Sequence, residues 1–382
     1  MAIYLISFVI SAILLALADK QKIKIYKNLC TIIGLAIPCL LAGLRHETIG
    51  TDVQVYVKQL FEAASEANSF NDFLTKKWFA IWRYKYVQDF EIGFTVVVYL
   101  VTKIFCSFAA VLTAIHILIV LPIYYGLKSL GEKQPIWLGM LTFYFLFFNE
   151  SLNAMRQWIA MAILIFAFHY LVEKKICKYI IFVCVAMLFH NSALIGFGLM
   201  LIYYYFQPYG IGMFKTKRKY AHSSEMKAIT IVAFGCGIMC LMPLLEKILY
   251  IIGLDKYAIY ISGNISLMAN QIIIRLPILI LLLLNWKSVK SKDESSGFYL
   301  SMIIIDLILS QLMSVNKYAF RIASYCSSCN VLSLSAIYVS KEKKSNRNFV
   351  LIYIVSYILL YWLYFVAYKG ANETIPYLFG AD

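Results

Sequence analysis

Long apolar runs, unbroken by alternating polar residues, are the feature of this sequence that most restricts its fold. A helix needs ~20 predominantly apolar residues to cross a bilayer, and a spanning segment must satisfy its own backbone hydrogen bonds. Because the runs are continuous, they predict helices rather than the strands of a barrel. They fall at about 2–18, 28–44, 92–106, 108–127, 135–149, 158–172, 179–190, 191–206, 228–250, 271–286, 297–313, 322–340 and 349–368.

The composition agrees with an all-α polytopic membrane protein. Hydrophobic residues make up 62% and charged residues 14% of the chain, whereas globular proteins average roughly 45–50% and about 25%. We expect a single integral membrane domain over residues 1–382, with residues 45–90 as one long outer loop. The net charge of +15 comes largely from lysines in short loops, which are typical of cytoplasmic anchors. The bilayer is therefore the expected partner, and nucleic acid is not.

The basic residues also predict the orientation. One set of loops holds 21 Lys and Arg and the opposite set 11, of which six lie in the loop 45–90. Short loops rich in Lys and Arg are cytoplasmic, so the loop 45–90 should lie outside. The chain must then cross an odd number of times within 92–127, which we interpret as one span at 108–127 preceded by a short re-entrant or tilted helix. About 12 full spans result, with both termini outside.

The segment Gly43–Asp52 follows the second apolar run directly and carries Arg45. An unpaired charge near hydrocarbon is costly and tends to mark function. Asp52, with Tyr56 four residues further on, is typical of a helix cap. Beside an arginine, however, a carboxylate can hold a guanidinium in one orientation by paired hydrogen bonds, and we expect Asp52 to do this for Arg45.

Two further charged residues are predicted on the same outer face. Arg156 begins an apolar helix three residues after Asn153 and just before Gln157. A helix N-terminus with an arginine is a natural phosphate site. Glu91 begins the short helix, where a carboxylate is favourable with the helix dipole without any function; an orienting or catalytic role is the alternative.

His190 and Arg321 complete the outer set. His190 lies between two apolar helices with scarcely a loop, and histidine is the usual proton-transfer residue near neutral pH. Arg321 lies at the outer end of another helix, shortly after Lys317. Arg275, at the start of the helix that contains Pro277, is a fourth candidate arginine. One such arginine can be a snorkelling anchor, but several on one face favour a polyanionic ligand.

The remaining signals predict neither a cofactor nor a metal site. The sequence contains no GxxxxGK[ST] or HExxH motif and no DxD-type acidic cluster in a suitable context. Residues 61–86 mix aromatic and basic residues and are interpreted as an amphipathic helix lying in the membrane interface, with Trp78 and Trp82 as anchors.

Short motifs along almost the whole chain resemble the EpsG family of Wzy-like bacterial polymerases of exopolysaccharide, capsule or O-antigen. The similar segments are Gly43-Leu-Arg-His-Glu-Thr-Ile-Gly-Thr-Asp52, Glu91-Ile-Gly-Phe94, Asn153-Ala-Met-Arg-Gln157, Leu188-Phe-His-Asn-Ser-Ala193, Arg321 and Ile375-Pro-Tyr-Leu378. The resemblance implies a glycosyltransferase of the bacterial cytoplasmic membrane, which the missing metal motifs predict to be metal-independent and the loop charges predict to act outside. It would transfer a growing glycan from undecaprenyl diphosphate onto an incoming lipid-linked oligosaccharide repeat.

If the resemblance holds, the shared outer face of these residues suggests a role for each of them. Arg45, Arg156 and Arg321 would bind the diphosphate, Asn153, Gln157 and Tyr56 would support them, and the base would be one of His190, Glu91 and Asp52. A flippase and a chain-length regulator of the same pathway are candidate partners. The alternative function is a flippase of the same lipid-linked oligosaccharide, although its basic residues should spread along a central cavity. A membrane O-acyltransferase would also use a buried histidine, but the motifs do not favour it.

Overall fold

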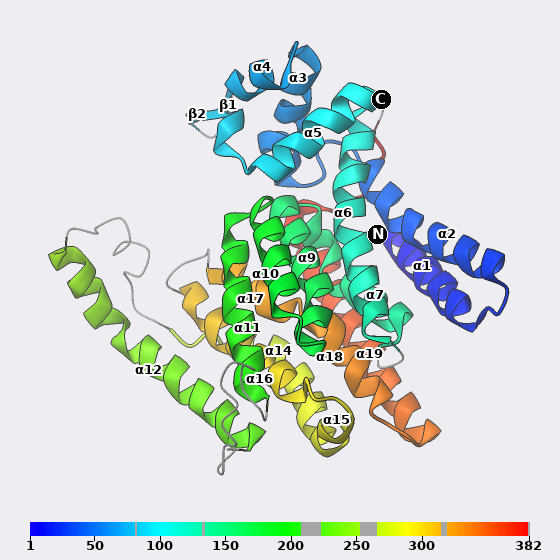
Figure 1. Cartoon of the computed structure of the whole chain (residues 1–382), viewed down its shortest axis with the longest axis vertical. Helices are drawn as coiled ribbons and strands as arrows, with labels where there is room; N and C mark the ends of the chain where they lie inside the picture. Colours follow the sequence, from blue (N-terminus) through cyan, green and yellow to red (C-terminus); the bar gives the residue numbers. More distant parts are fainter. Residues whose placement is uncertain (81, 132–133, 208–222, 253–265, 315–318, 381–382) are drawn as a thin grey trace. The chain divides into compact units, whose positions relative to one another are not determined.

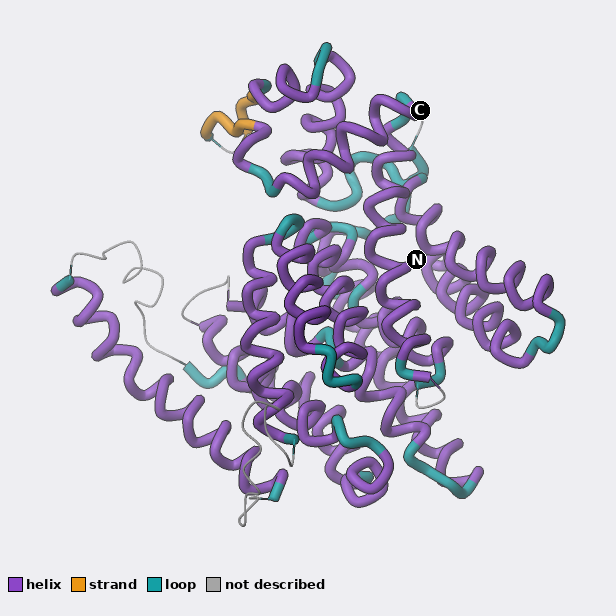
Figure 2. Tube along the Cα trace, viewed as in Figure 1, coloured by secondary structure: helices purple, strands orange, loops and turns teal. Residues whose placement is uncertain are grey.

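The structure, a computed structural model, describes residues 1–80, 82–131, 134–207, 223–252, 266–314 and 319–380. Most of the described chain is helical (Figure 2). It divides into two compact units, one of Met1–Gly196 with Ile354–Asp382 and one of Phe197–Tyr353.

The first unit is built on antiparallel apolar helices. α1 and α2 lie side by side, and α6 packs on both α2 and α9 (Figure 1). Gly43 allows the close approach of α2 to α6, because a Cβ there would overlap the hydroxyl of Thr113. Small residues at such contacts are typical of helix packing in membranes. The helices are α1 (Ala2–Lys20), α2 (Lys24–Gly43), α5 (Ile92–Phe105), α6 (Phe108–Ser129), α7 (Ile136–Leu146), α8 (Phe148–Ser151), α9 (Met155–Val172) and α10 (Ile176–Met187), followed by the 3-10 turn Asn191–Leu194. The next helix, α11 (Ile195–Phe206), starts at the end of this part of the chain and belongs mostly to the second unit.

Aromatic side chains fill the core between α1, α7, α8 and the end of the chain. Phe8 stacks on Tyr144 with ring centroids 5.4 Å apart, and it meets Phe148 edge to face at 5.1 Å. Trp362, from α19 (Lys344–Trp362), is fully buried and lies 6.3 Å from Tyr4. Such pairs contribute beyond the apolar area that they bury, so this cluster fixes the C-terminal helix against the first one.

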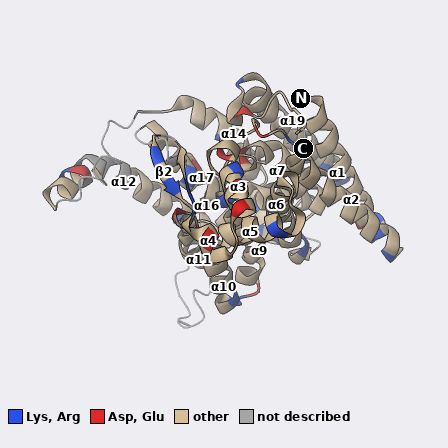
Figure 3. Ribbon diagram, turned by 90° about the horizontal axis from the view of Figure 1, so that it is seen from above, with Lys and Arg blue, Asp and Glu red and all other residues tan. Residues whose placement is uncertain are grey.

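The loop 45–90 differs from its prediction as an amphipathic helix over residues 61–86. It contains the π-helical turn Val53–Val57, α3 (Lys58–Glu66), α4 (Phe70–Thr75), an antiparallel hairpin of β1 (Lys77–Ala80) and β2 (Arg83–Tyr86), and the 3-10 turn Val87–Asp89. The helix interpretation was wrong for the hairpin, whose strand β2 alternates basic and aromatic residues, a period of two that favours strands. The basic residues of β2, Arg83 and Lys85, account for the blue parts of this strand in the ribbon of Figure 3.

The short helix α5 starts and ends at the same end of the first unit. Its N-cap, Glu91, pairs with Arg156 at the start of α9. After Cys106, where the backbone is left-handed with φ 50°, α6 begins at Phe108, which lines a pocket with Arg45 at the end of α2. The helix therefore lies across this end of the unit and returns the chain to it.

The second unit contains the helices α12 (Ser224–Ile251), α14 (Ala269–Leu284), α15 (Trp286–Lys292), α16 (Ser296–Gln311), α17 (Ala319–Ser327) and α18 (Asn330–Val339), with the 3-10 turn Leu312–Ser314 and the beginning of α19. Arg275 of α14 lies 2.8 Å from a carboxylate oxygen of Asp306 on α16, and both side chains are largely buried. This ion pair gives the intramembrane acid the partner on another helix that its position in an apolar segment requires.

Seven helices among the described residues are long and apolar enough to cross a membrane, and the bent pair α14–α15 raises this number to eight. Four shorter apolar helices, at Ile92–Phe105, Ile136–Leu146, Ile176–Met187 and Asn191–Phe206, have the composition but not the length of a span. The chain is therefore an all-α polytopic membrane protein apart from its hairpin. The larger number of about 12 spans, the single membrane domain and the outer position of the loop 45–90 stay predictions.

The first testable prediction concerns Asn149 in α8, which joins three segments in the buried core. Its amide donates to the Thr374 hydroxyl at 2.8 Å, and its carbonyl accepts from the Trp362 indole at 2.8 Å. We expect Asn149→Leu to lower the melting temperature of the purified protein, because each buried polar group left without a partner costs about 1–3 kcal/mol. The exposed Asn346→Leu is the matched control and should leave the melting temperature nearly unchanged. Equal melting temperatures for the two variants would contradict this role.

Candidate active site

Arg156 lies at the centre of the charged residues that the first unit brings together. It follows Met155 at the start of α9, and its guanidinium forms an ion pair with Glu91, the N-cap of α5. Glu91 also accepts a hydrogen bond from the backbone N–H of Asn191, at 3.3 Å. The side chains of Arg156 and Glu91 are 23% and 11% exposed. A charged pair with this little exposure is held in one geometry and still reaches the surface.

Two aromatic rings fix the plane of the Arg156 guanidinium. Its central carbon lies 4.9 Å from the ring centroid of Tyr56 and 4.8 Å from that of Phe90. Trp78 of β1 stacks on Phe90, with centroids 5.7 Å apart and an interplanar angle of 17°. A guanidinium over an aromatic face gains cation–π attraction. The hairpin therefore supports Arg156 through Phe90. Phe90 was not among the predicted site residues.

Asp52 and Tyr56 extend this group of contacts into the loop. The Tyr56 hydroxyl donates to a carboxylate oxygen of Asp52 at 2.9 Å. Burial and the negative charge of Asp52 raise the pKa of Tyr56, against the opposing effect of Arg156. Tyr56 is therefore neutral and can act as a donor to Asp52. The supporting residue Tyr56 thus contacts two of the predicted site residues.

His190 caps the 3-10 turn that follows α10. Its Nδ1 accepts from the backbone N–H of Ser192 at 3.2 Å and lies 2.5 Å from the Ser192 hydroxyl. Because Nδ1 is an acceptor here, the neutral imidazole carries its proton on Nε2. The next residue, Asn191, donates to Glu91, so His190 is adjacent to the Arg156–Glu91 pair.

Two glycines allow these segments to approach one another. Gly50 has a φ of +93°, and a Cβ there would lie 2.9 Å from the carbonyl oxygen of Leu152. The N–H of Gly93 donates to the Leu188 carbonyl at 2.8 Å, and a Cβ there would lie 2.7 Å from the same oxygen. Each glycine thus brings one short motif against the backbone of another, which explains why glycine stands in both motifs.

Arg45 is buried and 2% exposed. Its guanidinium donates to the carbonyl oxygens of Ala42, Ile49 and Leu152, the last two at 3.3 Å. Burial lowers its pKa to about 10, against the opposing effect of nearby tyrosines. The hydrogen bonds of Arg45 thus connect α2, the loop and the turn before α9. Asp52, which was expected to orient Arg45, instead accepts a hydrogen bond from the Tyr56 hydroxyl.

The C-terminal segment closes this end of the unit. Asn153 donates to the Asn372 carbonyl at 2.5 Å and lies within 3.3 Å of the Thr51 hydroxyl, which donates to it. Arg45 and Phe379 form an isolated antiparallel bridge. Gln157, the other predicted supporting residue, is buried in α9. The C-terminal segment was predicted only through the family resemblance, because the acceptor for Asn153 is the backbone carbonyl of Asn372, which no side chain signals.

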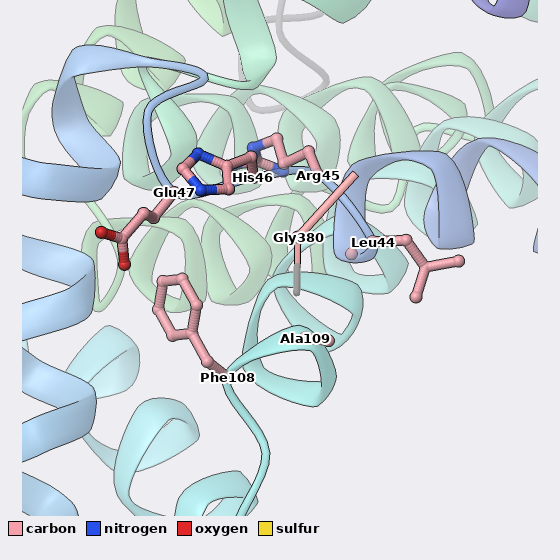
Figure 4. Close-up of a pocket in the computed structure, with 8 residues that line it drawn as sticks. Leu44, Arg45, His46, Glu47, Phe108, Ala109 and Gly380 are labelled. Carbon is pink, nitrogen blue, oxygen red and sulfur yellow. The ribbon is translucent and has the colours of Figure 1, made fainter. Parts of the chain in front are cut away.

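A pocket of about 240 Å³ lies beside Arg45 (Figure 4). Its lining comes from the end of α2, the start of α6 and the C-terminal segment, at Gly43, Leu44, Arg45, His46, Glu47, Phe108, Ala109 and Gly380. Glu47 pairs with Lys58 at 2.5 Å, and His46 contacts the Thr48 hydroxyl at 2.9 Å. The pocket thus has a mixed polar and charged wall next to the buried arginine.

Arg321 belongs to the second unit, where it lies exposed in α17. Lys317, predicted to accompany it, lies outside the described residues. A shared site for Arg321 and Arg156 stays a prediction. Across the described parts of the chain, no group of three or more His, Cys, Asp and Glu is placed to hold a metal ion.

The second testable prediction measures the coupling between Arg156 and Glu91. A double-mutant cycle with Arg156→Gln and Glu91→Gln should give a coupling energy above ~1 kcal/mol in the free energy of unfolding, because each single change leaves a largely buried charge without its partner. The control cycle is the exposed pair Glu173 and Lys175, 2.7 Å apart, where we expect less than ~1 kcal/mol. Additive effects of Arg156 and Glu91 would show that the pair is not coupled in solution.

Comparison with known proteins identifies the family. The family model of the EpsG family matches residues 27–379. No curated protein matches the chain. No solved structure matches it either. The match includes the four short segments that meet around Arg156, at residues 43–52, 91–94, 153–157 and 188–193. It also includes Arg321 and most of the C-terminal segment. The chain therefore belongs to the EpsG family, a family of Wzy-like polysaccharide polymerases.

Proposed function

We propose that this protein polymerises lipid-linked oligosaccharide repeats on the outer side of the bacterial cytoplasmic membrane. It transfers the growing glycan from undecaprenyl diphosphate onto a sugar hydroxyl of an incoming repeat. Membership of the EpsG family supports the substrate class. The observation that carries the proposal is the fixed guanidinium of Arg156, paired with Glu91 and placed between two aromatic rings at the start of α9.

The diphosphate is proposed to bind at Arg156. Its guanidinium is fixed by Glu91, Tyr56 and Phe90 but stays 23% exposed, and backbone N–H groups at a helix N-terminus favour an anion beside it. Negative charge develops on the departing diphosphate, and fixed cations that meet this charge stabilise the transition state. Asn153 and Gln157 flank Arg156 and support this binding.

The other two arginines are proposed to have different roles. Arg45 is nearly inaccessible, so it contributes positive charge without touching the ligand, and it holds the loop against α9. Arg321, which is exposed within its own unit, is proposed to contact the diphosphate or the attached glycan. Direct binding therefore rests on Arg156 and Arg321, and positioning rests on Arg45.

The proton of the attacking hydroxyl is proposed to go to Asp52. The hydroxyl oxygen attacks the anomeric carbon while the bond from that carbon to the diphosphate oxygen breaks, and the electron pair leaves with the diphosphate. Glu91 is engaged in orienting Arg156. The Nδ1 of His190 accepts from Ser192, so its Nε2–H is proposed to donate to a phosphate oxygen. Among the three candidate bases, Asp52 is the one that these two roles leave for proton acceptance.

The reaction itself tests this function. Purified protein in detergent or nanodiscs is incubated with lipid-linked repeats and no nucleotide. A ladder of glycan lengths with release of carrier diphosphate supports the polymerase. Movement of unextended repeats across a vesicle membrane, with no ladder, would instead support the flippase.

The third testable prediction separates the chemical role of Arg156 from its charge. Arg156→Ala should lower the polymerisation rate by roughly 100-fold or more, in the range of other removed transition-state donors. Arg156→Lys should recover little activity, because an ammonium lacks the planar fork and the stacking of a guanidinium. Arg347→Ala, in an exposed position of α19, is the matched control and should polymerise normally. Unchanged polymer length in Arg156→Ala, at a normal protein level in membranes, would contradict the assignment.

The fourth testable prediction concerns the base and uses pH. A histidine base would lose activity as the pH falls below about 6.5. We expect the wild-type rate to persist below this pH and the pH profile of His190→Gln to keep the wild-type shape at a lower rate. Asp52→Asn should abolish polymerisation at every pH, with His169→Gln as the histidine control. An acidic limb near 6.5 that disappears in His190→Gln would identify His190 as the base instead.

A further inference from the structure

A second hollow of the first unit lies along α2 and α6, and none of the candidate active-site residues lines it. It is a groove of about 480 Å³. Its walls are mainly apolar, and several of its lining side chains are open to the outside: Ile32 is 65%, Leu40 48% and Ile117 39% exposed. Both helices are candidate spans, so these side chains face the hydrocarbon of the bilayer.

One end of the groove is basic. Lys27 near the start of α2 and Lys128 near the end of α6 both line it. Lys128 lies 5.7 Å from the ring centroid of Tyr124 and 5.8 Å from that of Tyr125, which line the same end. None of the described residues that line the groove is acidic. Asp19 of α1 interacts electrostatically with Lys27, but it does not line the groove.

The basic end belongs to the loops predicted to be cytoplasmic. Lys27 and Lys128 fall within the ranges 20–28 and 128–134, two of the lysine-rich loops that the sequence predicts to be cytoplasmic. From Lys27 to Leu40 the groove follows α2 for ~20 Å, at ~1.5 Å per residue. One leaflet provides ~15 Å of hydrocarbon. The groove therefore has the length of one acyl chain, with its cations at the level of the headgroup.

We propose that this groove is a binding site for an anionic phospholipid of the inner leaflet. One acyl chain lies along Ile32, Leu35 and Ile117, and the headgroup phosphate meets the two lysines. Tyrosines beside lysines are typical of the membrane–water boundary. This site is independent of the proposed polymerase activity, and its basic end lies at the opposite end of α2 from Arg45.

The test uses purified wild-type protein in a neutral detergent. Native mass spectrometry and melting temperature are measured with phosphatidylglycerol, with phosphatidylethanolamine and with undecaprenyl phosphate as separate probes. We expect phosphatidylglycerol to bind in preference to phosphatidylethanolamine and to raise the melting temperature. The double variant K27Q/K128Q should weaken phosphatidylglycerol binding by roughly 30-fold, since each lysine near a membrane surface contributes about a factor of five.

Two further variants keep the test specific. K22Q/K343Q removes the same charge from exposed positions that do not line the groove, and it should bind phosphatidylglycerol like the wild type. Ala36→Trp fills the apolar part of the groove and should lower binding while both lysines remain. Equal binding of the two phospholipids, equal loss in both double variants, or displacement of phosphatidylglycerol by undecaprenyl phosphate at equal concentration would each overturn the proposal.

Discussion

The charge of Arg156 at the start of an apolar helix has to be balanced, and much of this end of the first unit is arranged by that requirement. Glu91 balances it, but only because α5 begins beside α9 and the loop 45–90 closes over both. The ion pair, the N–H of Asn191 and the rings of Tyr56 and Phe90 then fix the guanidinium. Pairs at low exposure are strongly destabilised by loss of one partner, so residues distant in sequence depend on each other here.

Much of this group of residues could be predicted, because each carries a signal of its own. Arg45, Glu91, Arg156 and His190 are ionisable residues at the ends of apolar runs, where a charge without a partner is costly. Their assignment to one face followed from counting basic residues in loops. The structure joins the segments that carry them within one unit. Hydropathy thus predicted which residues gather, since burial and charge are properties of single residues.

The partners of these residues could not be predicted in the same way. Asp52 was expected to orient Arg45, but the guanidinium of Arg45 donates to three backbone carbonyls and Asp52 accepts from Tyr56. Carbonyl acceptors have no signal in the side-chain sequence. The stacking of Trp78 on Phe90 was likewise missed, because the alternating hairpin was interpreted as a helix. Short strands and backbone contacts depend on tertiary neighbours, which one sequence does not reveal.

The burial of Arg45 also changes how the site works chemically. A guanidinium at 2% exposure cannot bind a phosphate without breaking its bonds to carbonyls, each of which would then be left unsatisfied. Arg156 has the opposite arrangement, because aromatic faces and one carboxylate hold it and leave an edge at the surface. Rings hold a guanidinium in position without using up its N–H donors. A site that stabilises a transient negative charge therefore works better with the arrangement of Arg156. There the rings and Glu91 orient the guanidinium, and its remaining N–H groups stay available to the ligand.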